Sequence, residues 1–383
     1  MLRSNSHARW LLALASTFIV LGLCEGLCRR MFKKNVEALA FSEADIFYYL
    51  DREGYWHNIP NRVGYQRLWN DQGRAQFRIN SLGFRGPEMS LVKPAGTFRL
   101  LFLGDSITIG GRLPEDAIFV SRVARALASQ GGPRYEIANG GIGDVGLYEE
   151  EQLLKGVGIR THPDLVVLCW YLNDARPPVG FPDEVVFKNP VIRWFNGQGW
   201  LRRSYLAGFI YERVRKAAVR HQLHLMDAQN HRFEWASDYM SNQWASDPQA
   251  LARLVREARY DWGDAWDERS LAWMAGRIAG LRDLTARNGS RFAVVMMPVH
   301  AQVYAGFASP LVDQPQRQLA ERLRAAGIPY LDLLGLLRPY VQSHPGFKVF
   351  YDQCHYTPGG NGVVADAILG FLKRDRLLSP QSL

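Results

Sequence analysis

The stretch Phe98-Arg-Leu-Leu-Phe-Leu-Gly104-Asp105-Ser106 decides the fold of this 383-residue chain. Its apolar run is typical of a buried strand, and the residues that follow predict a turn that exposes a serine. Serine is a weak nucleophile until a base takes its proton, and that base works best when a carboxylate orients it. Near the other end of the chain, Asp352-Gln-Cys-His355 places a carboxylate and an imidazole three residues apart. The two segments together hold the three parts of a nucleophilic serine site.

From residue 99 onward, strand-like runs alternate with helix-like segments, which predicts a parallel sheet covered by helices on both faces. The expected strands are 99–103, 135–138, 164–170, 291–297 and 328–332, and the expected helices are 117–129, 147–159, 267–287, 314–326 and 359–373. In such sheets, ligands bind beyond the carboxyl ends of the strands. Ser106, Gly143 and Asn173 follow the first three strands, so we expect them at one edge of the sheet.

Two further segments lie between the ends, Asn139-Gly-Gly-Ile-Gly143-Asp144 and Trp170-Tyr-Leu-Asn173-Asp174. In this order and spacing, the four segments resemble the four sequence blocks of the SGNH/GDSL hydrolase superfamily, over roughly residues 75–375. The resemblance implies an α/β fold of three layers (αβα), flavodoxin-like, with a parallel five-stranded sheet. It also implies a serine esterase or acyl hydrolase that forms an acyl-enzyme and needs neither a metal nor an organic cofactor.

Carried over by position, the resemblance makes Ser106 the nucleophile, His355 the general base and Asp352 its orienting partner. The backbone N–H groups of Ser106 and Gly143 and the side-chain amide of Asn173 would then form the oxyanion hole.

Two positions depart from the family pattern. Tyr171 stands two residues before the Asn, where the third block usually has a glycine. In the second block, ungapped alignment places Asp144, and not Gly143, at the usual glycine. An Asp side chain beside a developing oxyanion is repulsive unless it is turned away, so Gly143 is the preferred donor and the choice between the two stays open.

The N-terminal segment predicts a membrane anchor over residues 1–34. Trp10 to Cys24 is an almost unbroken apolar run that extends to Leu27 across Glu25. It is slightly short of the ~20 residues that a spanning helix needs. A cleaved signal peptide is the alternative, because Ala38-Leu39-Ala40 resembles a cleavage site. Four basic residues separate that site from the apolar run, which favours an uncleaved transmembrane helix: Arg29, Arg30, Lys33 and Lys34.

The orientation of this helix is open to two interpretations. Basic residues flank both ends and are more numerous on the C-terminal side, so the positive-inside rule read literally keeps the large domain in the cytoplasm. The family resemblance implies the opposite, because membrane-tethered members commonly act outside the cytoplasm. We favour an extracytoplasmic, periplasmic-side domain.

Composition excludes some classes of protein. With 47% apolar and 12% aromatic residues, the chain can bury a core and is not disordered. The net charge of +9 is compatible with nucleic acid. The basic residues are spread along the chain without a nucleic-acid-binding motif, however, so anionic lipid or acidic glycan partners fit at least as well. The four cysteines show no zinc spacing and are expected to be free thiols packed as small hydrophobic residues.

Three regions are expected after the anchor. Residues 35–95 form a lead-in or cap, in which a hairpin around Ala75-Gln-Phe-Arg-Ile79 precedes the core and Arg85 is a structural residue in preference to a substrate ligand. Residues 96–383 form the hydrolase domain. Within it, residues 175–266 break the strand–helix alternation and carry six tryptophans, as expected of a helical or irregular insertion that forms a lid or binding loop.

The sequence leaves the substrate and the acceptor open. The preferred function is hydrolysis of an O-acyl ester, on an O-acetylated glycan or on a lipid. One alternative is an O-acyltransferase that passes the same acyl group to a cell-surface polysaccharide, and another is a non-catalytic glycan-binding scaffold. The retained Ser106, Asp352 and His355 argue against the scaffold. The oligomeric state is not predicted.

Overall fold

The computed structural model describes residues 6–39, 48–50, 55–129, 133–143, 145–175, 204–210, 213–214, 217, 243–258 and 262–378. The chain forms two compact units. The smaller comprises Met1–Ile46 and Pro182–Gln229, and the larger comprises Phe47–Phe181 and Asn230–Leu383. All of the predicted site residues belong to the larger unit.

A parallel five-stranded sheet forms the centre of the larger unit. Its strands are β5 (Thr97–Gly104), β6 (Arg134–Gly141), β7 (Leu165–Tyr171), β8 (Arg291–Met297) and β9 (Tyr330–Asp332). They pair in the order β6-β5-β7-β8-β9, and each of the four pairs is parallel. Counted from β5, this is the 2-1-3-4-5 order of flavodoxin-like folds. The expected three-layer fold and its five strands are confirmed.

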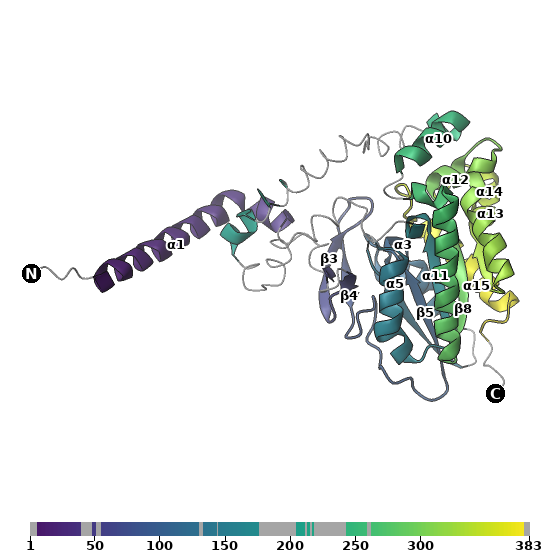
Figure 1. The fold of residues 1–383 in the computed structure, drawn as a ribbon, viewed down its shortest axis with the longest axis horizontal. Coiled ribbons are helices and arrows are strands. Elements are labelled where there is room, and N and C mark those ends of the chain that lie inside the picture. The colour runs from purple at the N-terminus through teal and green to yellow at the C-terminus, as the bar shows by residue number, and fades with distance from the viewer. Residues whose placement is uncertain are drawn as a thin grey trace, which may run out of the picture. The chain divides into compact units, whose positions relative to one another are not determined.

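Helices cover both faces of the sheet. Helices α4 (Phe119–Ala128) and α15 (Pro358–Arg374) pack together on one face. On the other face lie α5 (Leu147–Leu153), α11 (Glu268–Arg287) and α13 (Pro310–Ala325). Figure 1 shows α5 and α11 side by side across the sheet. The two central strands are buried along their whole length because both faces are covered, which explains why β5 and β7 are apolar runs without alternation.

In the described part of the larger unit, four α-helices lie outside the predicted set. They are α3 (Ser106–Ile109), α10 (Pro248–Glu257), α12 (His300–Tyr304) and α14 (Leu334–Ser343). Two of these are too short to show a helical period in sequence. Helix α14 contains Pro339, which normally argues against a helix interior.

The lead-in region packs against the sheet as a hairpin. Strand β3 (Arg62–Arg67) pairs antiparallel with β4 (Arg74–Ile79), as predicted, and β1 (Tyr48–Leu50) pairs with β2 (Trp56–Asn58). Arg85, just after the hairpin, forms bridges to Ile79 and to Asn139 of β6. The hairpin is thereby joined to the edge of the central sheet.

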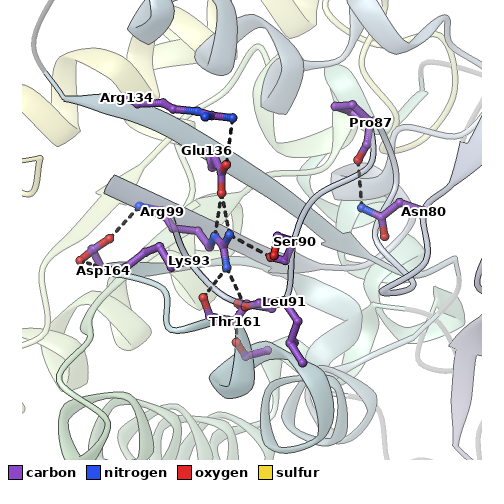
Figure 2. Close-up of polar contacts among 11 residues, drawn as sticks. Asn80, Pro87, Ser90, Leu91, Lys93, Arg99, Arg134, Glu136, Thr161 and Asp164 are labelled. Atoms are coloured by element: carbon purple, nitrogen blue, oxygen red, sulfur yellow. Dashed lines mark hydrogen bonds and ion pairs between the residues drawn. The ribbon is translucent and has the colours of Figure 1, made fainter. Parts of the chain in front are cut away.

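A buried arginine fastens the chain between the hairpin and β5. The side chain of Arg99 is fully buried, and its Nη2 lies 2.6 Å from the Glu136 carboxylate. The same guanidinium donates to the carbonyl oxygens of Ser90, Leu91 and Thr161 (Figure 2). Because every donor group has an acceptor, this charge can be buried without a large desolvation cost. The network attaches residues 90–93 to the amino end of the sheet.

In the smaller unit, α1 (Ser6–Leu39) contains one stretch, Arg9–Met31, that is long and apolar enough to cross a membrane. A signal sequence has the same properties. Glu25 lies within this stretch and accepts hydrogen bonds from the Tyr205 and Leu206 backbone N–H groups, both at 2.8 Å, and from the Ser204 hydroxyl at 2.7 Å. The carboxylate therefore caps the helical turn that begins at residue 205 of the predicted insertion.

Candidate active site

The nucleophile candidate Ser106 is the first residue of α3, directly after β5. Gly104, at the end of the strand, has φ of +156°, and a Cβ there would collide with the Thr108 hydroxyl. Only glycine allows this close approach of strand and helix. Asp105 caps the helix, because its side chain accepts the Ile107 N–H at 2.9 Å. The strand–turn–helix geometry presents the Ser106 hydroxyl at the carboxyl end of the sheet.

The structure brings Ser106, His355 and Asp352 together from segments almost 250 residues apart in the sequence. His355 Nε2 lies 2.8 Å from Ser106 Oγ. On the other side of the ring, Nδ1 lies 2.8 Å from Asp352 Oδ2 and 3.0 Å from Oδ1. Asp352 Oδ1 also accepts the backbone N–H groups of Cys354 and His355, at 3.0 and 2.8 Å. The geometry is that of a serine, a base and an orienting carboxylate.

The Asp352 carboxyl stays ionised in this setting. Burial by itself raises its pKa, but the hydrogen bond and charge of His355 and the two backbone N–H groups outweigh burial, so the net pKa lies below its ordinary value. The ring of Tyr351 stacks on the His355 ring, with centroids 5.6 Å apart and an interplanar angle of 12°. Tyr351 thus limits the movement of the imidazole, a contact that the sequence motif does not reveal.

The oxyanion-hole candidates lie at the same sheet edge. Asn173 follows β7 and is nearly fully buried, and its amide donates to Asp105 Oδ2 and to the Val145 carbonyl, both at 3.3 Å. These bonds are long for N–H···O contacts. Gly143 lies two residues beyond β6, whose end is tied to β5 by the Ile142 N–H and the Gly104 carbonyl at 3.1 Å. Asp144 lies outside the described residues, so the choice between Gly143 and Asp144 remains a prediction.

Buried carboxyl groups surround Asn173, and sequence reasoning passed over them. Asp105 holds the start of α3 with one oxygen and Asn173 with the other, so it connects two blocks of the site. Asp174 accepts the Tyr171 N–H at 3.1 Å. Glu150 of α5 is fully buried near both, and its pKa lies well above the ordinary value because of burial first and then because of the nearby charges of Asp174, Asp105 and Glu149. Burial and the neighbouring charges therefore favour the protonated form of Glu150.

Arg85 supports the helix that begins at Ser106. Its buried guanidinium donates to the Ile109 and Gly110 carbonyls at 2.5 Å and to the Leu113 carbonyl at 2.6 Å. These are carbonyl groups at the end of α3 and just beyond it, where a helix leaves acceptors without partners. Arg85 thus has the contacts of a structural residue, the interpretation preferred from the sequence.

A cleft of about 580 Å³ opens beside Asp352, the carboxylate that contacts His355. Its lining is mainly aromatic, with a lysine and a histidine: Trp69, Ala245, His300, Tyr304, Gly346, Phe347, Lys348, Phe350, Tyr351 and Asp352. Burial lowers the pKa of His300 to about 4, so this imidazole is neutral at neutral pH. Trp69, which comes from the turn between β3 and β4, packs against Tyr351 with ring centroids 5.9 Å apart. The lead-in hairpin therefore supplies one wall of the cleft.

Of the six tryptophans of the predicted insertion, three lie among the described residues and three do not. Trp244 and Trp262 are buried in the main core, and Trp266 donates its indole N–H to the Leu311 carbonyl at 2.7 Å. Among the described residues of the insertion, Ala245 lines the cleft described above. Trp194, Trp200 and Trp235 lie outside the described residues. For the three described tryptophans, the structure shows packing in the core and not a wall of the cleft.

Comparisons with known proteins give similarity at the level of the fold. No protein-family profile matches the chain, and no curated protein matches it. An acetyl xylan esterase structure is 14% identical, with a TM-score of 0.40 over 71% of this chain and 98% of the other. An acetylxylan esterase from Geobacillus stearothermophilus is 14% identical, with a TM-score of 0.37 over 72% and 94%. A lipase/acylhydrolase from Enterococcus faecalis is 13% identical, with a TM-score of 0.36 over 75% and 100%.

Proposed function

We propose that the chain is a serine ester hydrolase of the SGNH type. The observation that carries this proposal is the continuous contact from Ser106 Oγ to His355 Nε2 and from His355 Nδ1 to the Asp352 carboxylate, each at 2.8 Å. A serine without a base is inert, whereas this arrangement allows the hydroxyl to lose its proton as it attacks. The depressed pKa of Asp352 keeps its negative charge available to stabilise the imidazolium that forms.

The reaction follows from the placement of the groups. His355 Nε2 takes the proton of Ser106 as its oxygen attacks the ester carbonyl. The Ser106 N–H, the Asn173 amide and the N–H of Gly143 or Asp144 would donate to the tetrahedral oxyanion. The alcohol leaves with the proton from His355 and yields an acyl-Ser106 ester. Water, activated by His355, then attacks that ester and restores the serine.

The cleft beside Asp352 supports an alcohol of substantial size, such as a glycan hydroxyl. The aromatic cleft borders Asp352, which contacts Nδ1 of His355, and Tyr351, whose ring stacks on that imidazole, so it lies beside the base of the proposed site. Flat aromatic rings with a few polar groups suit a sugar ring, and we therefore propose an O-acyl ester of a glycan as the substrate, with a lipid ester as the alternative.

We further propose that the catalytic unit is held at a membrane by residues 1–34, on the extracytoplasmic side. The apolar stretch Arg9–Met31 supports an anchor. The lead-in over 35–95 and the hydrolase domain over 96–383, with its insertion at 175–266, remain the proposed division of the chain.

Labelling with a fluorophosphonate probe tests the proposal. The probe reacts with an activated serine, so we expect one adduct on Ser106 in the full chain, located by peptide mass spectrometry. Ser106→Ala should abolish both the adduct and hydrolysis of acetylated oligosaccharides, whereas Ser129→Ala, at an exposed serine on the surface, should leave both unchanged. Absence of the adduct in a folded protein would refute the mechanism. Transfer of the acyl group to an added glycan in preference to water would point to the transferase.

A further inference from the structure

A thiol lies against the catalytic pair and has no part in ester hydrolysis. Cys354 Sγ is 3.5 Å from His355 Nδ1, on the same side of the ring as Asp352. The donor atoms of Asp352, Cys354 and His355 all lie within 4.8 Å of one another. Thiolate, imidazole and carboxylate are the three side-chain ligands that zinc prefers. We propose that these residues form a zinc-binding site whose occupation reversibly inhibits the enzyme.

Two of the three distances between donor atoms are close to those of a zinc site. A tetrahedral ion with Zn–N of about 2.0–2.1 Å and Zn–S of about 2.3 Å holds the nitrogen and sulfur about 3.5 Å apart. The separation of His355 Nδ1 and Cys354 Sγ is 3.5 Å. The same geometry asks for about 3.3 Å between nitrogen and oxygen, against 2.8 and 3.0 Å to the two Asp352 oxygens. The carboxylate therefore needs to withdraw from the nitrogen by only a few tenths of an ångström. The sulfur and the carboxylate oxygen, which lie within 4.8 Å of each other, would have to settle about 3.5 Å apart.

An ion has a route to this site and room for a fourth ligand. Asp352 lines the cleft of about 580 Å³, so zinc can approach the carboxylate from solvent. Water from the cleft would complete the tetrahedron. Cys354 itself is 4% exposed, and it reaches the ion from the protein side.

Binding would change the protons in a defined way. The Cys354 thiol must lose its proton to bind zinc, so one proton is released per ion. His355 stays neutral, but Nδ1 becomes a ligand and the ring proton moves to Nε2. That nitrogen then cannot accept the proton of Ser106, and Asp352 is no longer free to orient the ring. Inhibition follows from the wrong tautomer, without any change in the fold.

The other three cysteines lack this setting in the described part of the chain. Cys24 and Cys28 lie in α1, and Cys169 is buried within β7. Among the described residues, the Asp352, Cys354 and His355 group is the one in which three such donors converge. Cys354 therefore distinguishes this site from an ordinary catalytic pair.

The test measures metal binding and hydrolysis separately, on the full chain in detergent. Cobalt chloride replaces zinc for spectroscopy, because a cobalt–thiolate bond gives a charge-transfer absorption band. We expect one band per chain, lost in Cys354→Ser and Cys354→Ala and kept in the Cys24→Ala/Cys28→Ala double variant. Zinc chloride should displace cobalt, release one proton and inhibit ester hydrolysis until a chelator is added.

The two cysteine variants should hydrolyse the ester without zinc and bind zinc at least about tenfold more weakly. Thermal melting of both variants checks that they fold, and Cys354→Ala serves if serine is not tolerated in the buried position. Equal zinc inhibition of wild type and variants, or no cobalt–thiolate band, would overturn the site while leaving ester hydrolysis intact. A Cys354-dependent band in a protein that hydrolyses no ester would instead refute the proposed function and support the metal site.

The inhibition of ester hydrolysis by zinc rests on the proposed function, whereas the binding of zinc does not.

Discussion

At Asn173, two 3.3 Å hydrogen bonds to Asp105 and Val145 hold the amide next to the residue that precedes Ser106. In the proposed mechanism, long bonds of this kind would let the N–H groups turn toward the oxyanion as it forms, so that the donor would stabilise the transition state most. Asp105 is the residue that links this amide to the start of α3. The short motif around Ser106 thus includes a carboxylate that positions Asn173 as well as the proposed nucleophile.

Replacement of Asn173 by alanine should lower kcat by about 10²–10³ with little change in KM, because the lost donor acts mainly on the developing oxyanion. Steady-state kinetics on an acetylated oligosaccharide measure both constants. Asn288→Ala, in which an exposed amide contacts only the Leu284 carbonyl, is the matched control and should leave both unchanged. If Asn173→Ala loses thermal stability but keeps wild-type kinetics, the side chain only caps a turn.

Glu150 predicts a pH dependence of stability. Its pKa is raised in the folded chain, so the native state keeps a proton that the unfolded state loses above its ordinary pKa of about 4.3. The free energy of unfolding should therefore fall as pH rises above that value, until the folded pKa is reached. Glu150→Gln removes this cost and should flatten the profile and raise the melting temperature at neutral pH.

Thermal melting of the wild type and Glu150→Gln from pH 4 to about 8 measures this slope. Glu268→Gln is the control, because the Glu268 side chain is 84% exposed and should leave the profile unchanged. Identical slopes in wild type and Glu150→Gln would show that Glu150 ionises normally.

Among the elements, the connection between the lead-in hairpin and β5 depends on one buried charge. The Arg99 guanidinium donates hydrogen bonds to acceptors in β6, in the 90–93 segment and in the residues before β7 (Figure 2). The network lies at the amino end of the strands, whereas the site lies at the carboxyl end. The hairpin reaches the site from that anchored position, through Trp69 and Arg85.

Arg99→Ala should destabilise the larger unit by about 3–5 kcal/mol, because it leaves Glu136 partly buried without its main partner. Chemical denaturation measures the loss. Arg134 pairs with the same Glu136 carboxylate at 3.3 Å but its side chain is 70% exposed, so Arg134→Ala should cost only about 0–1 kcal/mol. Equal losses in the two variants would mean that burial of the Arg99 pair does not matter.

On the scale of the whole molecule, the smaller unit joins the N-terminal helix to part of the insertion. Glu25 receives three hydrogen bonds from residues 204–206. A carboxylate in an apolar helix needs such partners. The insertion thereby contributes to the smaller unit, in addition to its Trp-containing part in the core of the larger unit.

If α1 is an uncleaved anchor, the full chain should stay in the membrane pellet after carbonate extraction and dissolve only in detergent. Its apolar stretch Arg9–Met31 supplies enough hydrophobic length for that. Mass spectrometry of the purified protein should detect peptides from residues 1–34. Recovery of a soluble mature protein that begins after Ala40 would show a signal peptide instead.

Glu25→Ala should expose the segment around Ser204 without releasing the protein from the membrane, because it removes the cap of that helical turn and no apolar surface. Limited proteolysis of membrane fractions should then cut near residue 204 faster than in the wild type. Glu25→Gln, which keeps an acceptor oxygen, should lie between the two. Unchanged cleavage rates would mean that the contact with Glu25 does not order the segment.

Local patterns in the chain predict the five strands, the order of layers and the hairpin, because burial on both faces forces continuous apolar runs and turns need particular residues. They also single out Ser106, Asp352 and His355 as candidates. Distances such as the 2.8 Å between Ser106 and His355 arise only when strands far apart in sequence align at one edge. The same holds for the Arg99 network, the buried Glu150, the cleft beside Asp352 and the thiol of Cys354 against the imidazole. Each depends on contacts between side chains that meet only when the elements pack. The periodicity of apolar residues along the chain does not predict such contacts.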